Sequence, residues 1–314
     1  MVDTNEGAMR VLVTGAEGFL GANLCKELVE RGHEVTGASL NRSGLTSLDA
    51  LEVKCRIEYG DVTDADFVDR VITSSEPEWV FHLAAVSIVR VAQAAPALTL
   101  RTNILGTINV LEACSKLPWG KRVLIASSDK AYGDHGGKPY TENMPLKPTG
   151  AYEVSKTCAD HIGLLYGATV VRCANVYGAG DLNWSRLVPN SCRLALSGQA
   201  PQIYGDAAEA KREWLYIDDA VKAYILLAES GSPGAYNVGS GEQYSPIDVA
   251  DIITKHAVCM VPEWIEKKHA FYEIPVQVLD CNKIRMLGWE ADCNIHTGLE
   301  LTVDWYKDYL CASC

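Results

Sequence analysis

The stretch TGAEGFLGANLCKELVERG, residues 14–32, decides the fold. A short β-branched strand at residues 10–14 runs into it, and from Phe19 onward the apolar residues recur at helical spacing. Gly15, Gly18 and Gly21 stand between strand and helix in the pattern G-x-x-G-x-x-G. Such glycines allow a sharp turn and a close backbone approach to a pyrophosphate, which the helix N-terminus attracts. The stretch predicts a dinucleotide site with Phe19 and Leu20 in the first helical turn; a tight turn without a ligand is the alternative.

Strands and helices continue to alternate through the first 172 residues. Nearly all-apolar strands are expected in HEVTGASL, PEWVFHLAA, KRVLIASS and ATVVRCANVYG, with helical stretches between them. Strands that are apolar on both faces are typical of a parallel sheet covered by helices on each side. We therefore expect an α/β fold in which residues 1–172 form a doubly wound parallel sheet, a Rossmann domain. Residues 173–314 are expected to form a smaller C-terminal substrate-binding α/β region, of which about 214–238 returns to pack on the first domain.

Composition excludes several classes of protein. The chain has 314 residues and a formal net charge of −12, which argues against a general nucleic-acid binder, because phosphate contact needs clustered Lys and Arg. No apolar run reaches the roughly 18 residues that a membrane helix needs, and the N-terminus lacks a secretory pattern. Of the 11 cysteines, only Cys311 and Cys314 at the tail stand in C-x-x-C spacing. The cysteines are expected to be reduced, so we expect a cytoplasmic protein without a metal site.

The sequence leaves the choice of dinucleotide open. An acid at the end of the second strand normally binds the adenine ribose, but Ser39 occupies that position. Arg42 follows closely and could meet a 2′-phosphate. We expect NAD as the cofactor, with NADP not excluded. Asp61 is expected at the adenine edge, with a simple loop-capping role as the alternative.

Tyr152 and Lys156, in the motif YEVSK, carry the second chemical signal. Their i, i+4 spacing places both on one face of a helix. A nearby ammonium favours the phenolate, so it lowers the pKa of a tyrosine. Such a tyrosine can take a proton from a sugar hydroxyl while a nicotinamide takes the hydride.

With these motifs in place, the sequence resembles the extended short-chain dehydrogenase/reductase family, and within it the nucleotide-sugar 4,6-dehydratases. The resemblance runs nearly end to end, through TGAEGFLG, GDVTD, FHLAA, RTNILGTINVLEA, SSDKAYG, YEVSK, RCANVYGAGD, KREWLYIDDAVKAY and LGWEADCNIHTGLELTVDWY. It implies that the substrate is a nucleotide-diphosphate hexose. It also implies a homodimer, in which the helices over residues 100–114 and 151–166 pair across a two-fold axis.

Site residues follow from the same resemblance. It implies that Ser128 hydrogen-bonds the sugar, that Tyr152 is the hydroxyl base and that Lys156 binds the nicotinamide ribose. Asn175 and Arg212 match positions that contact the substrate diphosphate, although Arg212 could also belong to a charged surface loop. The remaining cofactor positions are Val62, Leu83, Ala84, Ala85 and Asn103, and the remaining substrate positions are Ser87, Arg90, Arg186 and Leu187.

Asp129 and Lys130, inside SSDKAYG, favour a dehydratase. The resemblance places an acid and base there in 4,6-dehydratases, and the Asp-Lys version is most similar to the cytidine diphosphate-glucose enzymes. Once C4 is oxidised, neutral Lys130 would remove the C5 proton and protonated Asp129 would protonate the leaving C6 hydroxyl; burial favours both neutral forms. An exposed salt bridge is the structural alternative. A sugar 4-epimerase, or a non-catalytic NAD(P)-binding sensor, is the functional alternative.

Overall fold

The computed structural model describes residues 7–42, 44–117, 122–204, 210–257, 262–265 and 274–312. The chain divides into two compact units. Unit 1 comprises Met1–Ala131, Pro148–Arg172 and Tyr224–Tyr236, and unit 2 comprises Tyr132–Lys147, Cys173–Ala223 and Asn237–Cys314. Residues 132–147 therefore cluster with unit 2, although they lie inside the range 1–172 that the sequence assigns to the first domain.

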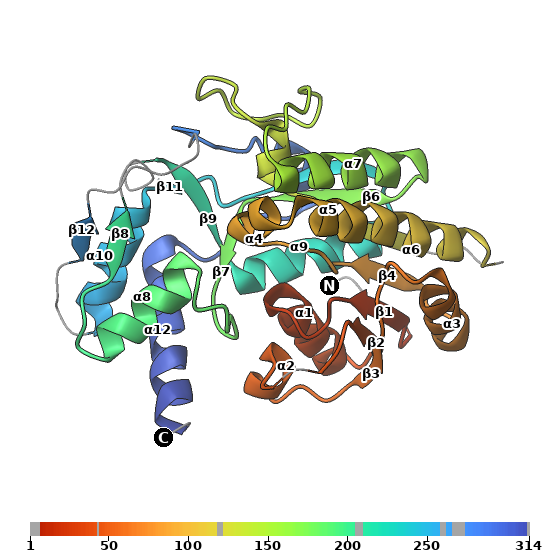
Figure 1. The fold of residues 1–314 in the computed structure, drawn as a ribbon, viewed down its shortest axis with the longest axis horizontal. Helices are drawn as coiled ribbons and strands as arrows, with labels where there is room; N and C mark the ends of the chain where they lie inside the picture. Colours follow the sequence, from red (N-terminus) through yellow and green to blue (C-terminus); the bar gives the residue numbers. More distant parts are fainter. Residues whose placement is uncertain are drawn as a thin grey trace. The chain divides into compact units, whose positions relative to one another are not determined.

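A seven-stranded sheet follows the order β10-β6-β5-β4-β1-β2-β3 (Figure 1). The pairs β1–β2, β1–β4, β2–β3, β4–β5 and β5–β6 are parallel. The order reverses at β1, which lies between β2 and β4, and ligands of such sheets bind beyond the carboxyl ends of the strands at this point. The doubly wound α/β fold is thus confirmed. The strands are β1 (Arg10–Thr14), β2 (Glu34–Ser39), β3 (Arg56–Tyr59), β4 (Trp79–His82), β5 (Arg122–Ala126), β6 (Thr169–Cys173) and β10 (Gly234–Val238).

Helices bury their apolar faces on this sheet. One core cluster joins Leu12 of β1 and Val80 of β4 to α3 (Ala65–Ser75) and α6 (Gly106–Ser115). Another joins Ile125 of β5 to Leu111 of α6 and Ala159 of α7 (Ala151–Leu165). The first helix of the unit, α1 (Phe19–Glu30), follows the glycine turn, and the short α2 (Ser47–Ala50) follows β2.

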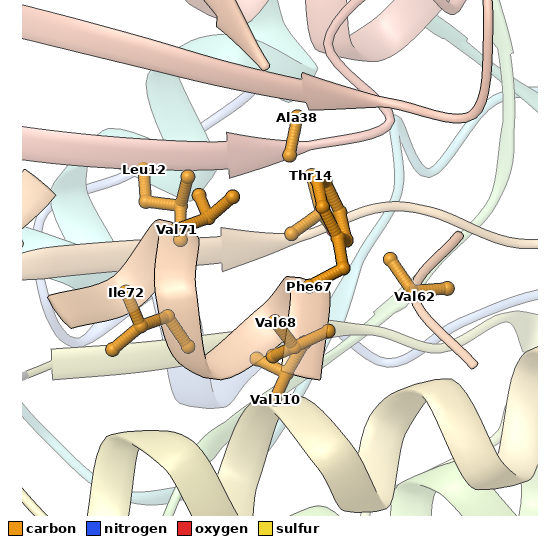
Figure 2. Close-up of a pocket in the computed structure, with 9 residues that line it drawn as sticks. All are labelled: Leu12, Thr14, Ala38, Val62, Phe67, Val68, Val71, Ile72 and Val110. Atoms are coloured by element: carbon orange, nitrogen blue, oxygen red, sulfur yellow. The ribbon is translucent and has the colours of Figure 1, made fainter. Parts of the chain in front are cut away.

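A narrow gap remains in the first cluster (Figure 2). Apart from Thr14, its walls are apolar side chains, so it is a gap in core packing rather than a site for a polar ligand. The lining residues are Leu12, Thr14, Ala38, Val62, Phe67, Val68, Val71, Ile72 and Val110.

The helix expected over residues 100–114 is not regular. After α4 (Val89–Ala94) and α5 (Pro96–Leu100), the segment Arg101–Leu105 forms a π-helix that leads into α6. In a π-helical turn the backbone hydrogen bonds join residues i and i+5 instead of i and i+4, and such turns are frequent at functional sites. Helices α5 and α6 lie beside α7 (Figure 1).

Unit 2 contains two small sheets and a group of packed helices. Strands β7 (Asn175–Tyr177), β9 (Arg212–Tyr216) and β11 (Gln243–Tyr244) form one sheet, and β8 (Gln202–Tyr204) pairs with β12 (Glu263–Ile265). Helices α8 (Leu187–Leu196), α10 (Pro246–Ala257) and α12 (Ile295–Ala312) pack together. The bounds of α9 and α11 are Ile217–Ser230 and Asn282–Arg285. In the described part of the chain, no helix is long and apolar enough to cross a bilayer.

Candidate active site

The glycine turn joins β1 to α1 and leaves an open helix N-terminus. Gly15 adopts a left-handed φ of 72°, and a Cβ on Gly21 would lie 2.2 Å from the Gly15 carbonyl oxygen. The turn and the helix therefore lie so close together that only glycine fits at position 21. Among the described residues, no side chain caps α1 at Gly18, which leaves first-turn N–H groups, those of Phe19 and Leu20, to meet an anion. A pyrophosphate fits this turn.

The polar residues beyond β2 already have partners. Ser39 Oγ accepts a hydrogen bond of 3.3 Å from the N–H of Glu17, within the glycine turn. The Arg42 guanidinium forms an ion pair of 3.3 Å with Asp49, whose carboxylate also completes the capping box of α2. Asp49 therefore competes with a 2′-phosphate for the Arg42 guanidinium, in an ion pair that is exposed. The arrangement favours NAD over NADP.

The loops after β3 and β4 carry the residues that the sequence predicts at the adenine side of the site. Asp61 is exposed, and its Oδ1 accepts a hydrogen bond of 2.8 Å from the N–H of Thr63. One carboxylate oxygen thus caps the loop, as the simpler alternative expects. Val62 is buried and lines the gap in Figure 2, while Leu83, Ala84 and Ala85 follow β4 and are half-buried.

The end of β5 carries a connected set of polar groups. Ser128 Oγ–H donates to Asp129 Oδ1 over 3.0 Å, and the N–H of Lys130 donates to Ser128 Oγ over 3.2 Å. Asp129 is only 3% exposed, while Lys130 is half-buried. An exposed salt bridge therefore does not describe this pair, since its only carboxylate, that of Asp129, lies in the interior. Both residues belong to a 3₁₀ turn, Asp129–Tyr132.

Tyr152 and Lys156 lie one turn apart on α7, and both are buried. The Lys156 ammonium donates to the carbonyl oxygen of Ala126, 2.7 Å away, so it reaches the end of β5. Burial lowers the pKa of Lys156 to about 8. The ammonium is therefore held beside the strand end that carries Ser128.

A buried hydrogen-bonded chain lies next to this pair. His82, at the end of β4, contacts Thr14 Oγ1 through Nδ1 at 2.8 Å and Thr107 Oγ1 through Nε2 at 3.1 Å. Burial, and secondarily the charge of Lys156, lowers the pKa of His82 to about 3, so the imidazole is neutral at physiological pH. Sequence reasoning missed His82, although a histidine at the end of an apolar strand was the available signal.

Asn103, expected near the cofactor, lies in the π-helix and is buried. Its Oδ1 accepts from the N–H of Val86 at 2.8 Å, and its Nδ2 donates to the Val86 carbonyl at 3.2 Å and to Ser155 Oγ at 2.8 Å. Asn103 thus ties the loop after β4 to the helix that carries Tyr152. The two other unit 1 candidates, Ser87 and Arg90, lie in and just after this loop and are exposed.

Four substrate candidates belong to unit 2. Asn175 of β7 donates to the Glu213 carbonyl over 3.2 Å, and Arg212, on the adjacent strand β9, is 6% exposed and donates to the Lys211 carbonyl over 2.9 Å. A charged surface loop therefore does not describe Arg212. Arg186 occupies the N-cap position of α8, directly before Leu187, and forms an ion pair with Asp181. Both Arg186 and Leu187 are half-buried.

Gln277 is a further candidate that sequence reasoning missed. Its N–H donates to the Lys211 carbonyl over 3.0 Å, so it lies beside the start of β9. The side chain is 2% exposed, and neither amide atom has a hydrogen-bond partner among the described residues. A buried amide without hydrogen bonds destabilises the folded protein unless another polar group binds it. Because Gln277 lies beside the start of β9, where Arg212 stands, its side chain is a candidate ligand contact.

Comparisons with known proteins agree with this geometry. The parallel sheet, the glycine turn and the Tyr152–Lys156 pair define a dinucleotide-dependent enzyme, and the open helix N-terminus fits the pyrophosphate of NAD. A model of the NAD dependent epimerase/dehydratase family matches residues 11–239. The chain belongs to this family.

Several relatives are similar over nearly the whole chain. The dTDP-glucose 4,6-dehydratase of Neisseria gonorrhoeae is 31% identical, covering 96% of this chain and 97% of its own. The UDP-glucose 4-epimerase of Thermotoga maritima, solved with UDP-glucose, has a TM-score of 0.87 at 27% identity, covering 96% and 100%. The dTDP-glucose 4,6-dehydratase DesIV of Streptomyces venezuelae, solved with NAD bound, has a TM-score of 0.86 at 26% identity, covering 96% and 97%.

Proposed function

We propose that this chain is an NAD-dependent nucleotide-sugar 4,6-dehydratase, which converts a nucleotide-diphosphate hexose into its 4-keto-6-deoxy derivative. The observation that carries the proposal is the pair Asp129–Lys130 directly after Ser128. Asp129 is buried and bonded to Ser128 Oγ, in the same unit as the glycine turn and Tyr152. An epimerase needs no acid and base at this point, because it only removes hydride from C4 and returns it to the same carbon.

Each side chain has a role in this chemistry. NAD⁺, held at the turn of Gly15, Gly18 and Gly21, would supply the hydride acceptor for C4 and the hydride donor for C6. Tyr152 takes the proton of the C4 hydroxyl, Ser128 hydrogen-bonds the same oxygen, and the Lys156 ammonium favours the phenolate of Tyr152. The 4-ketone acidifies the C5 proton, which neutral Lys130 removes. Protonated Asp129 gives its proton to the departing C6 hydroxyl, so that water leaves, and Lys130 returns its proton to C5 when hydride reaches C6.

The second unit supplies the substrate contacts in this proposal. Arg212 and Asn175 offer donors to the diphosphate, and Arg186 and Leu187 stand at the start of α8. Unit 2 is accordingly the substrate-binding region. We also place the enzyme in the cytoplasm, because the cysteines of the described residues are free thiols and a reducing compartment keeps them so.

A homodimer belongs to the same proposal. Unit 1 exposes apolar side chains on neighbouring helices: Leu98 of α5 is 55% exposed and Leu165 at the end of α7 is 81% exposed. Exposed apolar groups on adjacent helices are typical of a protein interface. Pairing these helices across a two-fold axis would cover them in both copies.

Two variants test the chemistry, since they should fail at different steps. In Lys130→Ala the C5 proton has no base, so reduced nicotinamide and a bound 4-keto-hexose should accumulate without loss of water. In Asp129→Asn the leaving hydroxyl lacks a proton donor, so dehydration should slow by about 10² to 10⁴, while deuterium exchange at C5 persists. The readouts are near-ultraviolet absorbance of the reduced cofactor and the mass of the product.

The substrate panel should hold hexoses of cytidine, deoxythymidine, uridine and guanosine diphosphate. Lys138→Ala removes an exposed lysine eight residues further on and should leave every step unchanged. If both site variants invert C4 at the wild-type rate and no water is lost, the protein is a 4-epimerase. If both lose cofactor reduction as completely as Tyr152→Phe, the pair is not dedicated to elimination.

A further inference from the structure

The helix face that carries Tyr152 and Lys156 continues to Asp160, which lies four residues after Lys156 on α7. Asp160 is fully buried, and its carboxylate accepts hydrogen bonds from three donor groups. Ser127 Oγ–H lies 2.9 Å from Oδ2. The Arg172 guanidinium donates through Nε to Oδ2 and through Nη2 to Oδ1, each at 2.8 Å. These residues, Ser127, Asp160 and Arg172, are called the Asp160 cluster below.

The Asp160 cluster joins three elements of unit 1 at one point. Asp160 lies on α7, Arg172 on β6, and Ser127 directly after β5. The N–H of Ser127 also donates to the Val171 carbonyl over 2.8 Å, next to Arg172. The residue before Ser127 accepts from the Lys156 ammonium, so two successive residues of the strand end are fastened to α7.

This placement matters because the two reactive hydroxyls come from different elements. Ser128 is the next residue of the strand end, and Tyr152 lies two turns before Asp160 on α7. Both hydroxyls must reach one sugar oxygen at the same time. A rise of about 1.5 Å per residue places Asp160 roughly 12 Å along the helix from Tyr152, so the cluster anchors the helix at a distance from the chemistry.

Stability alone does not account for a buried ion pair at this place. Removing two charges from water is costly, and an apolar pair of similar volume often serves a fold equally well or better. What an apolar pair cannot supply is the directed geometry of a bidentate arginine and a carboxylate.

We propose that Ser127, Asp160 and Arg172 are positioning residues, which fix the Ser128 hydroxyl relative to the Tyr152 hydroxyl. The inference rests on the roles proposed above for Ser128 and Tyr152. None of the three touches the substrate; they act through the strand end and the helix. Because misplacing reacting groups by about 1 Å can cost about 10² in rate, their loss should lower kcat rather than substrate affinity.

The main test replaces the ion pair by apolar residues, in the double variant Asp160→Leu/Arg172→Met. The variant should fold and retain NAD, as judged by cofactor released on denaturation. Its kcat per NAD-loaded site should fall roughly 10- to 100-fold, with KM within about threefold of wild type. Single-turnover formation of reduced nicotinamide should slow by the same factor. A folded, NAD-loaded double variant with wild-type kcat would overturn the proposal.

A milder pair of variants covers the case in which the double variant fails to fold. Ser127→Ala removes one donor and leaves the ion pair in place, so it should slow the same step by several-fold. Ser127→Thr keeps the hydroxyl and should restore the rate. Equal rates in Ser127→Ala and wild type would refute the positioning role.

The matched control lies on the same strand at its other end. The Arg122 guanidinium donates to the carbonyl oxygens of Ala228 and Glu229 at 2.6 and 2.5 Å. Arg122→Met should lower stability but leave turnover per NAD-loaded site unchanged; a loss of kcat equal to that of the double variant would mean that any damage to β5 has the same effect. Failure of the proposed function is separate, because it would appear as C4 inversion without loss of water in the wild-type protein. Full activity in Tyr152→Phe would instead remove the role on which the positioning rests.

Discussion

At the scale of single residues, Lys156 carries a charge where a charge is costly. Its ammonium is buried against the end of β5, and this burial holds its pKa at about 8, against 10.5 for a free lysine. The folded protein therefore binds this proton more weakly than the unfolded chain. At pH 7 both states are protonated, and the difference costs folding on the order of 3 kcal/mol.

Lys156→Met should consequently stabilise the protein while it abolishes turnover. The gain in the free energy of unfolding should approach 3 kcal/mol at about pH 7 and shrink as the pH rises from about 8 towards 10.5, where wild-type Lys156 becomes neutral in the folded state first. Urea unfolding at about pH 7 and about pH 9.5 measures both values. A variant less stable than wild type at neutral pH would show that the bond to Ala126 outweighs the cost of burial.

The position of a candidate residue could be predicted from sequence where it depends on local spacing. Tyr152 and Lys156 follow from one helical spacing, and Asp129 follows from its place at a strand end. Asp160 and Arg172 are twelve positions apart, and only the packing of α7 on β6 brings them together. His82 and Gln277 were missed for the same reason, since burial and missing partners are properties of the folded chain.

At the scale of elements, the close contact between α1 and the glycine turn makes a direct prediction. Gly21→Ala places a Cβ 2.2 Å from the Gly15 carbonyl oxygen, and backbone atoms cannot rotate away as a flexible side chain can. The N-terminus of α1 should move from the pyrophosphate position. We expect purified Gly21→Ala to retain less than about a tenth of the wild-type NAD content, since hydrogen bonds at the helix N-terminus carry that contact.

Lys26→Ala is the control for this change, because Lys26 is exposed on the same helix. Cofactor content is measured by mass spectrometry after denaturation, and fold retention by circular dichroism. Wild-type NAD content in Gly21→Ala would show that the turn can relax without losing its phosphate site.

Element types could be read from the sequence more readily than their irregularities. The sequence predicts one helix over residues 100–114, yet Arg101–Leu105 is π-helical. Asn103 lies in this π-helix and hydrogen-bonds Val86 and Ser155. Residues 178–190, GAGDLNWSRLVPN, are rich in Gly and polar residues and so predict a loop, but α8 begins inside them at Leu187. Its Pro189 lies within the first turn, where proline is compatible with a helix.

At the scale of the whole molecule, the parallel sheet determines where the candidate site residues of unit 1 lie. Parallel strands place their carboxyl ends at one edge, so the glycine turn, the end of β4 and the end of β5 all reach the same edge of unit 1. The alternation of predicted strands and helices along the sequence was sufficient to predict this edge of the sheet. The extent of unit 2 was harder to predict, since residues 132–147 join it from a position within the first domain of the sequence.

The oligomeric state gives the last prediction. Leu98 and Leu105 are 55% and 38% exposed on the helical segments next to α7, and burying such side chains stabilises an interface by roughly 25 cal/mol for each Å² of apolar surface. Wild-type protein should therefore sediment as a dimer at micromolar concentration. Leu98→Glu/Leu105→Glu should sediment as a monomer, because pairing would bury four carboxylates. Met286→Glu, which changes an 81% exposed methionine of unit 2, should remain a dimer. A wild-type monomer, or a double variant that still forms dimers, would mean that these helices do not form the interface.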